Sequence, residues 1–377
     1  MVVADSKPIS MALDAAFPDR SVERLTGVGP SWNGANETVG VTFADGDRAF
    51  LKIALTDESR RIARERAVLR YVDAHRPVPV PEVLAADPDG DPAYLATAPA
   101  RGRELLGVYE AASDGDRERL LRRVGGVLAA LHADRFGRHG EIVGVGTETG
   151  TAAQSDVAGG DVAGGSTVEE GAVESDLAER RDSATGLSVE FAPWPDGLLA
   201  TIERTREIGT SERLAGHYDA VADCVRANRD LLSGAPAALL HGDVTKPNLF
   251  VTTDGSDANR TGTDEAAGTR DPGIAPIDWE LSHVGDPARD LVRAEDQLLN
   301  SFDSTGPDRF PAALREGYRE RAGGLPAGFE RRRPVYEAVR MLGRSGFVDQ
   351  WATYLDEPVD ELVERADREL QARLDAV

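Results

Sequence analysis

The segment from Leu239 to Val251 carries the polar side chains best suited to chemistry. It reads Leu-Leu-His-Gly-Asp-Val-Thr-Lys-Pro-Asn-Leu-Phe-Val, so a polar loop joins two apolar runs. Within the loop, Asp243 and Asn248 stand five residues apart. An aspartate can accept the proton of a hydroxyl group, and an asparagine oxygen can bind magnesium. Phosphoryl transfer needs both, and this Asp-to-Asn spacing is that of a kinase catalytic loop.

Two further segments add carboxylates in suitable places. The first reads Ala-Pro-Ile-Asp-Trp-Glu and is expected to be a short strand that ends at Asp278 and is followed by Glu280. The second reads Gly-Asp-Pro-Ala-Arg-Asp-Leu and is expected to be a turn that leads into a helix carrying Asp290.

In this order, the three segments resemble the aminoglycoside phosphotransferase and choline kinase-like family of small-molecule kinases. That family carries a His-Gly-Asp loop ending in Asn, an Ile-Asp-Trp-Glu strand, and a Gly-Asp-Pro turn leading to Asp-Leu. The resemblance implies that Asp243 is the catalytic base and that Asn248 and Asp278 bind Mg²⁺. It also implies that His241 and Asp290 brace the catalytic loop by hydrogen bonds.

The resemblance covers most of residues 25–300, apart from two insertions, and it leaves some points open. Lys246 stands three residues after the base, where many relatives have proline or an apolar residue, and we expect it to contact the transferring phosphate. Glu280 could support a bound metal from behind its ligands or cap a helix. His283 could touch the substrate, although a role within its loop is the favoured interpretation. The identity of the acceptor alcohol is also open.

The N-terminal part can be argued from its residues directly. Only three of the 43 basic residues are lysines, and Lys52 is one of them, between two apolar residues of an expected strand. In the helix that follows, Glu65 lies on the same stripe as Ile62, Leu69 and Val72. A carboxylate on an apolar stripe is costly unless it is paired. We therefore expect a Lys52–Glu65 pair that holds nucleotide phosphates; the alternative is that Glu65 reaches solvent or pairs with a neighbouring arginine.

Two stretches flank this pair in the expected nucleotide site. By resemblance, the loop that carries Ser31, Gly34 and Asn36 covers the phosphates. Ala96 and Ala98 stand in a linker that resembles the hinge between lobes, where backbone groups would meet the adenine edge.

The chain predicts a bilobal α+β protein of the protein kinase-like fold. Residues 1–97 form a small antiparallel β lobe that binds nucleotide, and residues 98–377 form a mostly helical lobe that carries the catalytic loop and the acceptor site. The expected elements and insertions are a glycine-rich loop at 27–34, a hairpin at 37–53, helices at 58–74 and 117–133, a largely helical stretch at 199–232, and flexible insertions at 144–186 and 253–273.

Composition limits the possible partners. The 377 residues carry a formal net charge of −23, which disfavours binding to nucleic acid or to an anionic membrane. This acid excess with so little lysine resembles proteins of salt-adapted organisms. The single cysteine excludes an intrachain disulfide. Residues 1–20 do not show the basic and then apolar pattern of a signal peptide, and no apolar run reaches the length expected of a membrane span. We expect a cytoplasmic protein, a monomer or weak dimer.

The sequence thus predicts an enzyme that moves the γ-phosphoryl group of ATP or GTP, with Mg²⁺ as cofactor, to a hydroxyl group of a small molecule. Two alternatives stay open. One is a protein kinase, which Gly242 and the Asp-Trp-Glu segment disfavour, because protein kinases have Arg and Asp-Phe-Gly there. The other is a regulatory module that binds nucleotide without turnover.

Overall fold

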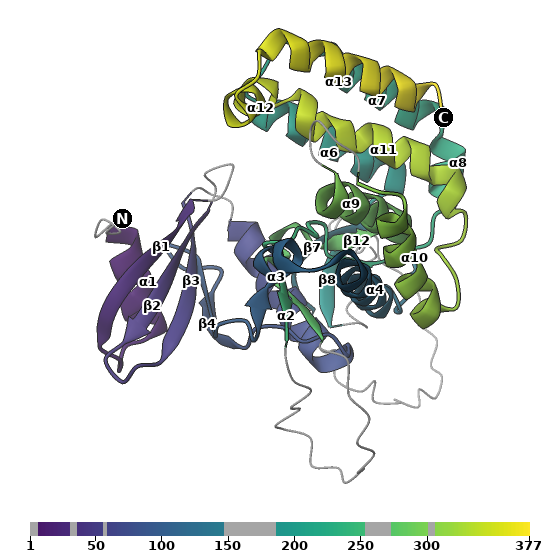
Figure 1. Ribbon diagram of the computed structural model, residues 1–377. Helices are drawn as coiled ribbons and strands as arrows, with labels where there is room; N and C mark the ends of the chain where they lie inside the picture. The colour runs from purple at the N-terminus through teal and green to yellow at the C-terminus, as the bar shows by residue number, and fades with distance from the viewer. Residues whose placement is uncertain (1–6, 31–35, 56–58, 147–185, 253–272, 301–305) are drawn as a thin grey trace, which may run out of the picture.

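The computed structural model describes residues 7–30, 36–55, 59–146, 186–252, 273–300 and 306–377. Its N-terminal part is an antiparallel sheet in the order β1-β2-β3-β5-β4, with two helices (Figure 1). These elements are β1 (Val22–Pro30), β2 (Asn36–Phe43), β3 (Arg48–Ala54), β4 (Val83–Asp87), β5 (Tyr94–Thr97), α1 (Lys7–Ala16) and α2 (Ser59–His75).

The expected hairpin at 37–53 is confirmed. Strands β2 and β3 pair in a register that sets Thr38 opposite Lys52. The turn between them uses Gly46 at a φ of +90°, a conformation that glycine adopts without steric cost. The hairpin therefore fixes the position in the sheet from which the Lys52 side chain projects.

The expected loop at 27–34 is only partly correct. Gly27 to Pro30 belong to β1, which pairs with β2 through an irregular register, whereas residues 31–34 lie outside the described ranges. Because β1 is the edge strand, Pro30 can end it without removing a hydrogen bond from the middle of the sheet. Loop composition alone could not reveal this pairing.

Helix α2 connects the sheet to the rest of the molecule. Ile62, Leu69 and Val72 are buried as their spacing predicts, and Glu65 is buried among them. The same helix packs against strand β7 (Gly140–Val145) and the 3₁₀ helix η1 (Trp279–Leu281), and its apolar residues share a core with Trp279. It thus carries Glu65 to the boundary between the two parts.

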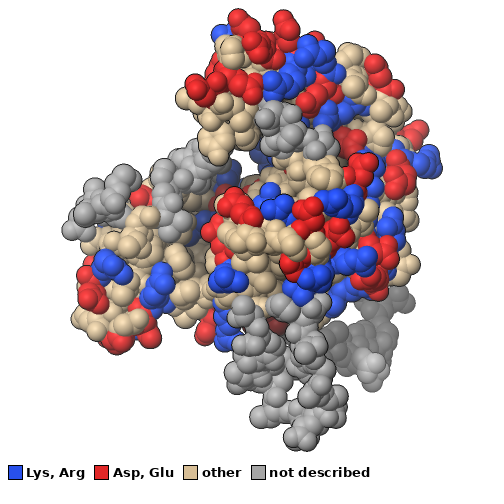
Figure 2. Space-filling model, viewed as in Figure 1, with Lys and Arg blue, Asp and Glu red and all other residues tan. Residues whose placement is uncertain are grey.

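The C-terminal part is mostly helical, as expected. Its helices are α3 (Leu105–Ala111), α4 (Asp114–Leu131), α6 (Trp194–Ile208), α7 (Gly216–Ala227), α8 (Arg229–Ser233), α9 (Pro287–Leu299), α10 (Arg309–Ala322), α11 (Phe329–Ser345), α12 (Val348–Leu355) and α13 (Val359–Leu374). Figure 2 shows a hollow between this part and the N-terminal sheet.

Two small sheets lie among these helices and carry the polar loops. Their orders are β11-β10-β6 and β8-β7-β12-β9. Besides β7, their strands are β6 (Arg103–Glu104), β8 (Leu187–Phe191), β9 (Ala238–Leu240), β10 (Leu249–Val251), β11 (Ile274–Pro276) and β12 (His283–Gly285).

The two insertions expected at 144–186 and 253–273 lie largely outside the described residues. At their edges, Gly144 and Val145 belong to β7, which pairs with β8. Strands β10 and β11, on either side of the second insertion, pair with each other as neighbours. No helix within the described ranges has the length and apolar character needed to cross a bilayer.

Candidate active site

The loop between β9 and β10 is held by one buried carboxylate. Asp290 of α9 accepts hydrogen bonds from the backbone N–H groups of His241 (2.9 Å) and Gly242 (3.0 Å). Its Oδ2 also lies 3.3 Å from Nε2 of His132, the residue that ends α4. Burial alone would raise the pKa of Asp290, but the His132 contact and the loop hydrogen bonds hold it well below its usual range.

The partners of His241 determine the state of its ring. Nδ1 lies 3.2 Å from the backbone N–H of Asp243, which can only donate, and Nε2 lies 3.1 Å from the carbonyl oxygen of Ile277, which can only accept. The ring is therefore neutral, with its proton on Nε2. Burial lowers the pKa of His241 and so favours this neutral form. His241 and Asp290 thus occupy positions from which they brace the loop.

Asp243 is surrounded by three side-chain donors. Oδ2 accepts from Asn248 Nδ2 at 3.0 Å, and Oδ1 accepts from Arg293 Nη2 and Gln297 Nε2, both at 2.9 Å. Burial would raise the pKa of Asp243, but the charge of Arg293 and the hydrogen bonds from Arg293 and Gln297 lower it below its usual value. The side chain is a carboxylate at neutral pH, as a proton acceptor must be.

Arg293 and Gln297 were not predicted from the sequence as residues of the site. Both lie on α9, three and seven residues after Asp290, so all three share one face of the helix. Once Asp290 is placed against the loop, this spacing directs the other two toward Asp243. The signal was therefore present in the sequence but depended on the orientation of α9.

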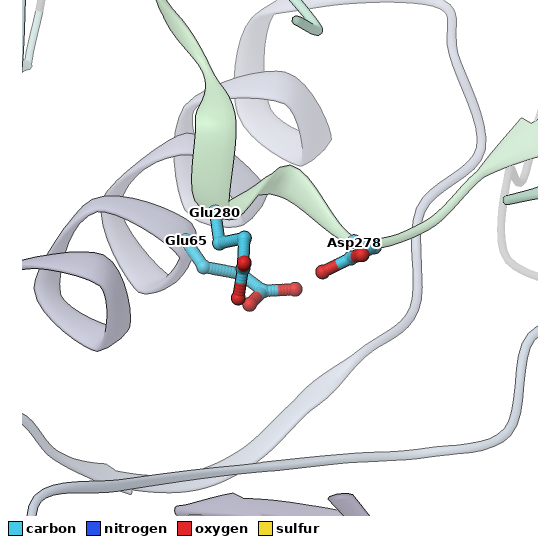
Figure 3. A group of neighbouring side chains, drawn as sticks. All are labelled: Glu65, Asp278 and Glu280. Atoms are coloured by element: carbon cyan, nitrogen blue, oxygen red, sulfur yellow. The ribbon is translucent and has the colours of Figure 1, made fainter. Parts of the chain in front are cut away.

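The expected Lys52–Glu65 ion pair is present, and two more carboxylates join it. Lys52 Nζ lies 2.7 Å from Glu65 Oε2, 2.6 Å from Asp278 Oδ1 and 3.0 Å from Glu280 Oε2. Figure 3 shows the three carboxylates pointing toward one another, Glu65 from α2, Glu280 from η1 and Asp278 from the residue just before η1. These carboxylates raise the pKa of Lys52 well above its usual value, although its burial acts in the opposite direction.

Glu280 is surrounded by three side-chain donors, and its role beside a bound metal stays a prediction. Besides Lys52, it binds Asn36 Nδ2 at 2.6 Å and Arg61 Nη1 at 3.0 Å. Burial would raise the pKa of Glu280, but Lys52 and Arg61 lower it. It therefore joins the start of β2 and helix α2 to η1, and it brings Asn36 to the Lys52 cluster.

The residues expected to bind magnesium lie just beyond the adjacent ends of the paired strands β10 and β11, Asn248 before β10 and Asp278 after β11. The backbone N–H of Ile277 donates to the carbonyl oxygen of Asn248 at 2.9 Å, which sets Asn248 beside the residue that precedes Asp278. Asp278 has a left-handed backbone (φ 64°, ψ 64°), which a short polar side chain tolerates better than most. One oxygen each from Asp278, Glu65 and Glu280 lies within 4.8 Å of the others, so the donor set consists of the oxygen ligands that Mg²⁺ prefers.

The remaining expected residues are placed as follows. Ala96 is buried within β5, and the backbone N–H of Ala98 donates to the carbonyl oxygen of Glu82 at 2.9 Å. Lys246 Nζ lies 4.9 Å from the ring centre of Tyr109 on α3. Ser31 and Gly34 lie outside the described residues.

His283 has partners inside the protein. Nδ1 lies 2.9 Å from the carbonyl oxygen of Leu281, so Nδ1 carries the proton and Nε2 accepts from Arg289 at 2.8 Å. Burial and the charge of Arg289 lower the pKa of His283 to about 3.

Comparison with known proteins identifies the family and the fold. Residues 28–260 match the model of the APH phosphotransferase enzyme family. No curated protein sequence matches the chain. Similar solved structures include the GDP and kanamycin complex of APH(2")-IIia (TM-score 0.56, 13% identity, 97% of each chain). Others are a macrolide 2'-phosphotransferase type I (0.52, 16% identity, 98% of each chain) and the macrolide 2'-phosphotransferase MphH from Brachybacterium faecium (0.50, 18% identity, 96% of this chain and 97% of that chain).

At these identities the structural matches establish the fold, which is that of the kinase-like phosphotransferases. The family match spans more than half of the chain, including the loop that carries Asp243. The chain therefore belongs to the phosphotransferase enzyme family.

Proposed function

We propose that the protein transfers the γ-phosphoryl group of ATP or GTP to a hydroxyl group of a small molecule. The division of labour follows the two parts: residues 1–97 bind the nucleotide, and residues 98–377 bind the acceptor and carry the base. The observation that carries the proposal is the convergence of two groups. These are the Lys52 cluster at the sheet and the braced carboxylate of Asp243 in the loop after β9.

Asp243 acts as the base in this proposal. The acceptor hydroxyl loses its proton to the Asp243 carboxylate as its oxygen bonds to the γ-phosphorus. The bond from that phosphorus to the bridging oxygen breaks, and the nucleoside diphosphate leaves. Hydrogen bonds from three side chains hold Asp243 in one orientation, so the enzyme contributes mainly positioning.

Lys52 and its partners serve the nucleotide. A lysine ammonium is a compact charge suited to phosphate oxygens, and Glu65 fixes its position from α2. Asn36 supports the same place from the start of β2 through Glu280. The backbone of the Ala96–Ala98 stretch borders the adenine in this proposal, with Ser31 and Gly34 in the loop over the phosphates.

Magnesium would be held by Asp278 and Asn248. The side chain of Asp278 is 37% exposed, more than that of Glu65 or Glu280, so it is the carboxylate of the cluster best able to reach a ligand. Asn248 gives its amide nitrogen to Asp243, which leaves the amide oxygen as the atom for a metal. When bound, the ion would offset the negative charge of the phosphates. Because this chemistry draws on intracellular nucleotide and Mg²⁺, we propose a cytoplasmic location.

A transfer assay tests the proposal. The protein is incubated with Mg²⁺, ATP or GTP, and a library of small alcohols, and products are identified by their added phosphoryl mass. We expect a phosphorylated small molecule, and we expect EDTA to abolish its formation. Labelling of added proteins but of no alcohol would indicate a protein kinase. Nucleotide binding with no transfer to any acceptor would indicate a regulatory module.

A further inference from the structure

Arg293 holds the proposed base in a closed hydrogen-bonded ring. Its Nη2 donates to Asp243 Oδ1 at 2.9 Å, and its Nε donates to Gln297 Oε1 at 3.1 Å. Gln297 Nε2 closes the ring on the same Oδ1 at 2.9 Å. Among the described residues, none accepts a hydrogen bond from Arg293 Nη1. The guanidinium is thus held rigidly beside the base with donors to spare.

Two further guanidinium groups border Arg293. Arg289 lies one turn earlier on α9, and Arg340 reaches in from α11. Burial and the charge of Arg293 lower the pKa of each to about 10, which shows that like charges crowd this region.

The nearby carboxylates already have other hydrogen-bond or ion-pair partners. Asp290 is occupied by the backbone of the catalytic loop and by His132. Asp296 lies 2.9 Å from Arg340 Nε and 2.8 Å from Arg344 Nη2, and Arg344 also pairs with Glu369 at 3.1 Å. Asp243 already accepts three hydrogen bonds and is the proposed base. Arg289 contacts His283 and the ring of Trp194 and forms no ion pair among the described residues, so its positive charge adds to that of Arg293 on the same helix.

We propose that the acceptor alcohol carries an anionic group, a carboxylate or a phosphate, that binds Arg293 beside Asp243. Arg289 and Arg340 provide the surrounding positive field. This inference rests on the proposed function and names its substrate class. A guanidinium suits the task because its planar fork can give two parallel hydrogen bonds to either kind of anion.

The same contact would prepare the base. An anionic group that binds the spare Nη1 donors shares the charge of Arg293 with Asp243. Arg293 then stabilises the Asp243 carboxylate less, so the pKa of Asp243 rises and it becomes a better acceptor for the hydroxyl proton. A cationic acceptor would instead be repelled by the Arg293 guanidinium and bind poorly.

Matched acceptors of different charge test the inference. One series is glycerol, glycerate, glycerol 3-phosphate and 3-amino-1,2-propanediol; another is glucose, gluconate, glucose 6-phosphate and glucosamine. With Mg²⁺ and ATP or GTP, we expect kcat/KM to be at least roughly tenfold higher for an anionic member than for its neutral counterpart, the scale of one charge-assisted hydrogen bond. The carboxylate and phosphate members distinguish the two anions.

Variants connect the preference to Arg293. In Arg293→Gln, the ratio of kcat/KM for the anionic acceptor to that for its neutral counterpart should fall at least roughly tenfold. Arg340→Gln provides an independent second test, with a fall in the same direction. Arg333→Gln is the matched control: it removes a charge from α11, but Arg333 pairs with Glu337 of its own helix, so the ratio should not change.

The outcomes separate the two proposals. A preference for neutral or cationic alcohols, or a ratio that survives both substitutions, would overturn the anionic acceptor while leaving phosphoryl transfer intact. Nucleotide binding without transfer to any alcohol would overturn the proposed function and this inference with it.

Discussion

At the scale of single residues, Lys52 explains why three carboxylates can lie close together at one place. Three carboxylates lie within 3.0 Å of its ammonium, and Arg61 supplies a second positive charge at Glu280. Two cations against three carboxylates leave one negative charge in excess. That excess can be offset by a bound cation, which agrees with the prediction of Asp278 as a metal ligand.

The geometry of Lys52 predicts that arginine cannot replace it. A planar and longer guanidinium cannot meet three carboxylates that converge on one nitrogen. We expect Lys52→Arg to lower kcat/KM for transfer at least roughly tenfold, or about 1.4 kcal/mol of transition-state stabilisation. Steady-state kinetics would measure this, with Lys7→Arg, at the exposed first residue of α1, as the silent control. Equal activity of the two variants would refute the role given to Lys52.

At the scale of elements, the catalytic loop depends on Gly242. This residue has a φ of +83°, and a Cβ added there would lie 2.4 Å from the carbonyl oxygen of Leu281. The close approach explains why glycine follows His241, and it lets Asp290 reach both backbone N–H groups.

Gly242→Ala should therefore lower the stability by more than the backbone strain alone would. Gly46→Ala is the matched control, because Gly46 also has a positive φ but a Cβ there would meet nothing within 4 Å. We expect Gly46→Ala to lower the free energy of unfolding by about 1–2 kcal/mol. Gly242→Ala should lower it further and also impair transfer. Denaturant unfolding would measure the free energy of unfolding of both variants. Equal losses of stability would show that the contact with Leu281 is unimportant.

The strands on either side of the long insertion predict that it can be shortened. Val145 of β7 lies opposite Leu187 of β8, and the backbone N–H of Gly146 donates to the carbonyl oxygen of Gly186 at 3.1 Å. The ends thus already meet in a hairpin. Replacing 147–185 with a short turn should leave the melting temperature unchanged or raise it, because a shorter loop costs less closure entropy.

Circular dichroism and the transfer assay would follow the shortened protein. Loss of folding would show that the insertion contributes to the core. Loss of transfer with intact nucleotide binding would show that the insertion serves the acceptor.

The sequence predicts some of these elements well and others poorly, for physical reasons. The hairpin and α2 follow from strong local signals, a turn glycine and a regular apolar stripe. Strand β1 was not predicted because its glycines and proline are typical of a loop. Its strand structure depends on pairing with β2, which its own residues do not indicate. Arg293 and Gln297 were missed because their role depends on how α9 is oriented, and that orientation is a tertiary property.

At the scale of the whole molecule, charge and buried histidines set the response to pH. Acidic and basic side chains are interspersed over the face shown in Figure 2, although acidic residues outnumber basic ones by 66 to 43. Burial lowers the pKa of His139, His241 and His283 in the folded protein, the last to about 3. Each is therefore neutral in the folded state at a pH where the unfolded chain would protonate it.

This difference predicts a loss of stability in mild acid. Below the unfolded histidine pKa of about 6.5, the unfolded state binds more protons than the folded state, so the free energy of unfolding rises with pH. The contribution is complete above that value and declines as pH falls toward about 3 for His283. Each neutral histidine can contribute up to about 1.4 kcal/mol per pH unit in this window. We expect a lower urea midpoint at pH 5 than at pH 7, and equal midpoints would contradict the neutral assignments.

The most direct test of the account is the substitution Asp243→Asn, which keeps the size of the side chain but removes its charge and its capacity as a base. With Mg²⁺, nucleotide and an accepted alcohol, we expect turnover to fall roughly 10²-fold or more, the scale of a positioned base. Nucleotide affinity, measured by calorimetry, should change little, because Lys52 and its partners are untouched. Asp223→Asn, at an exposed position on α7, should retain full turnover. Near-normal turnover of Asp243→Asn would contradict the central claim that this carboxylate accepts the hydroxyl proton.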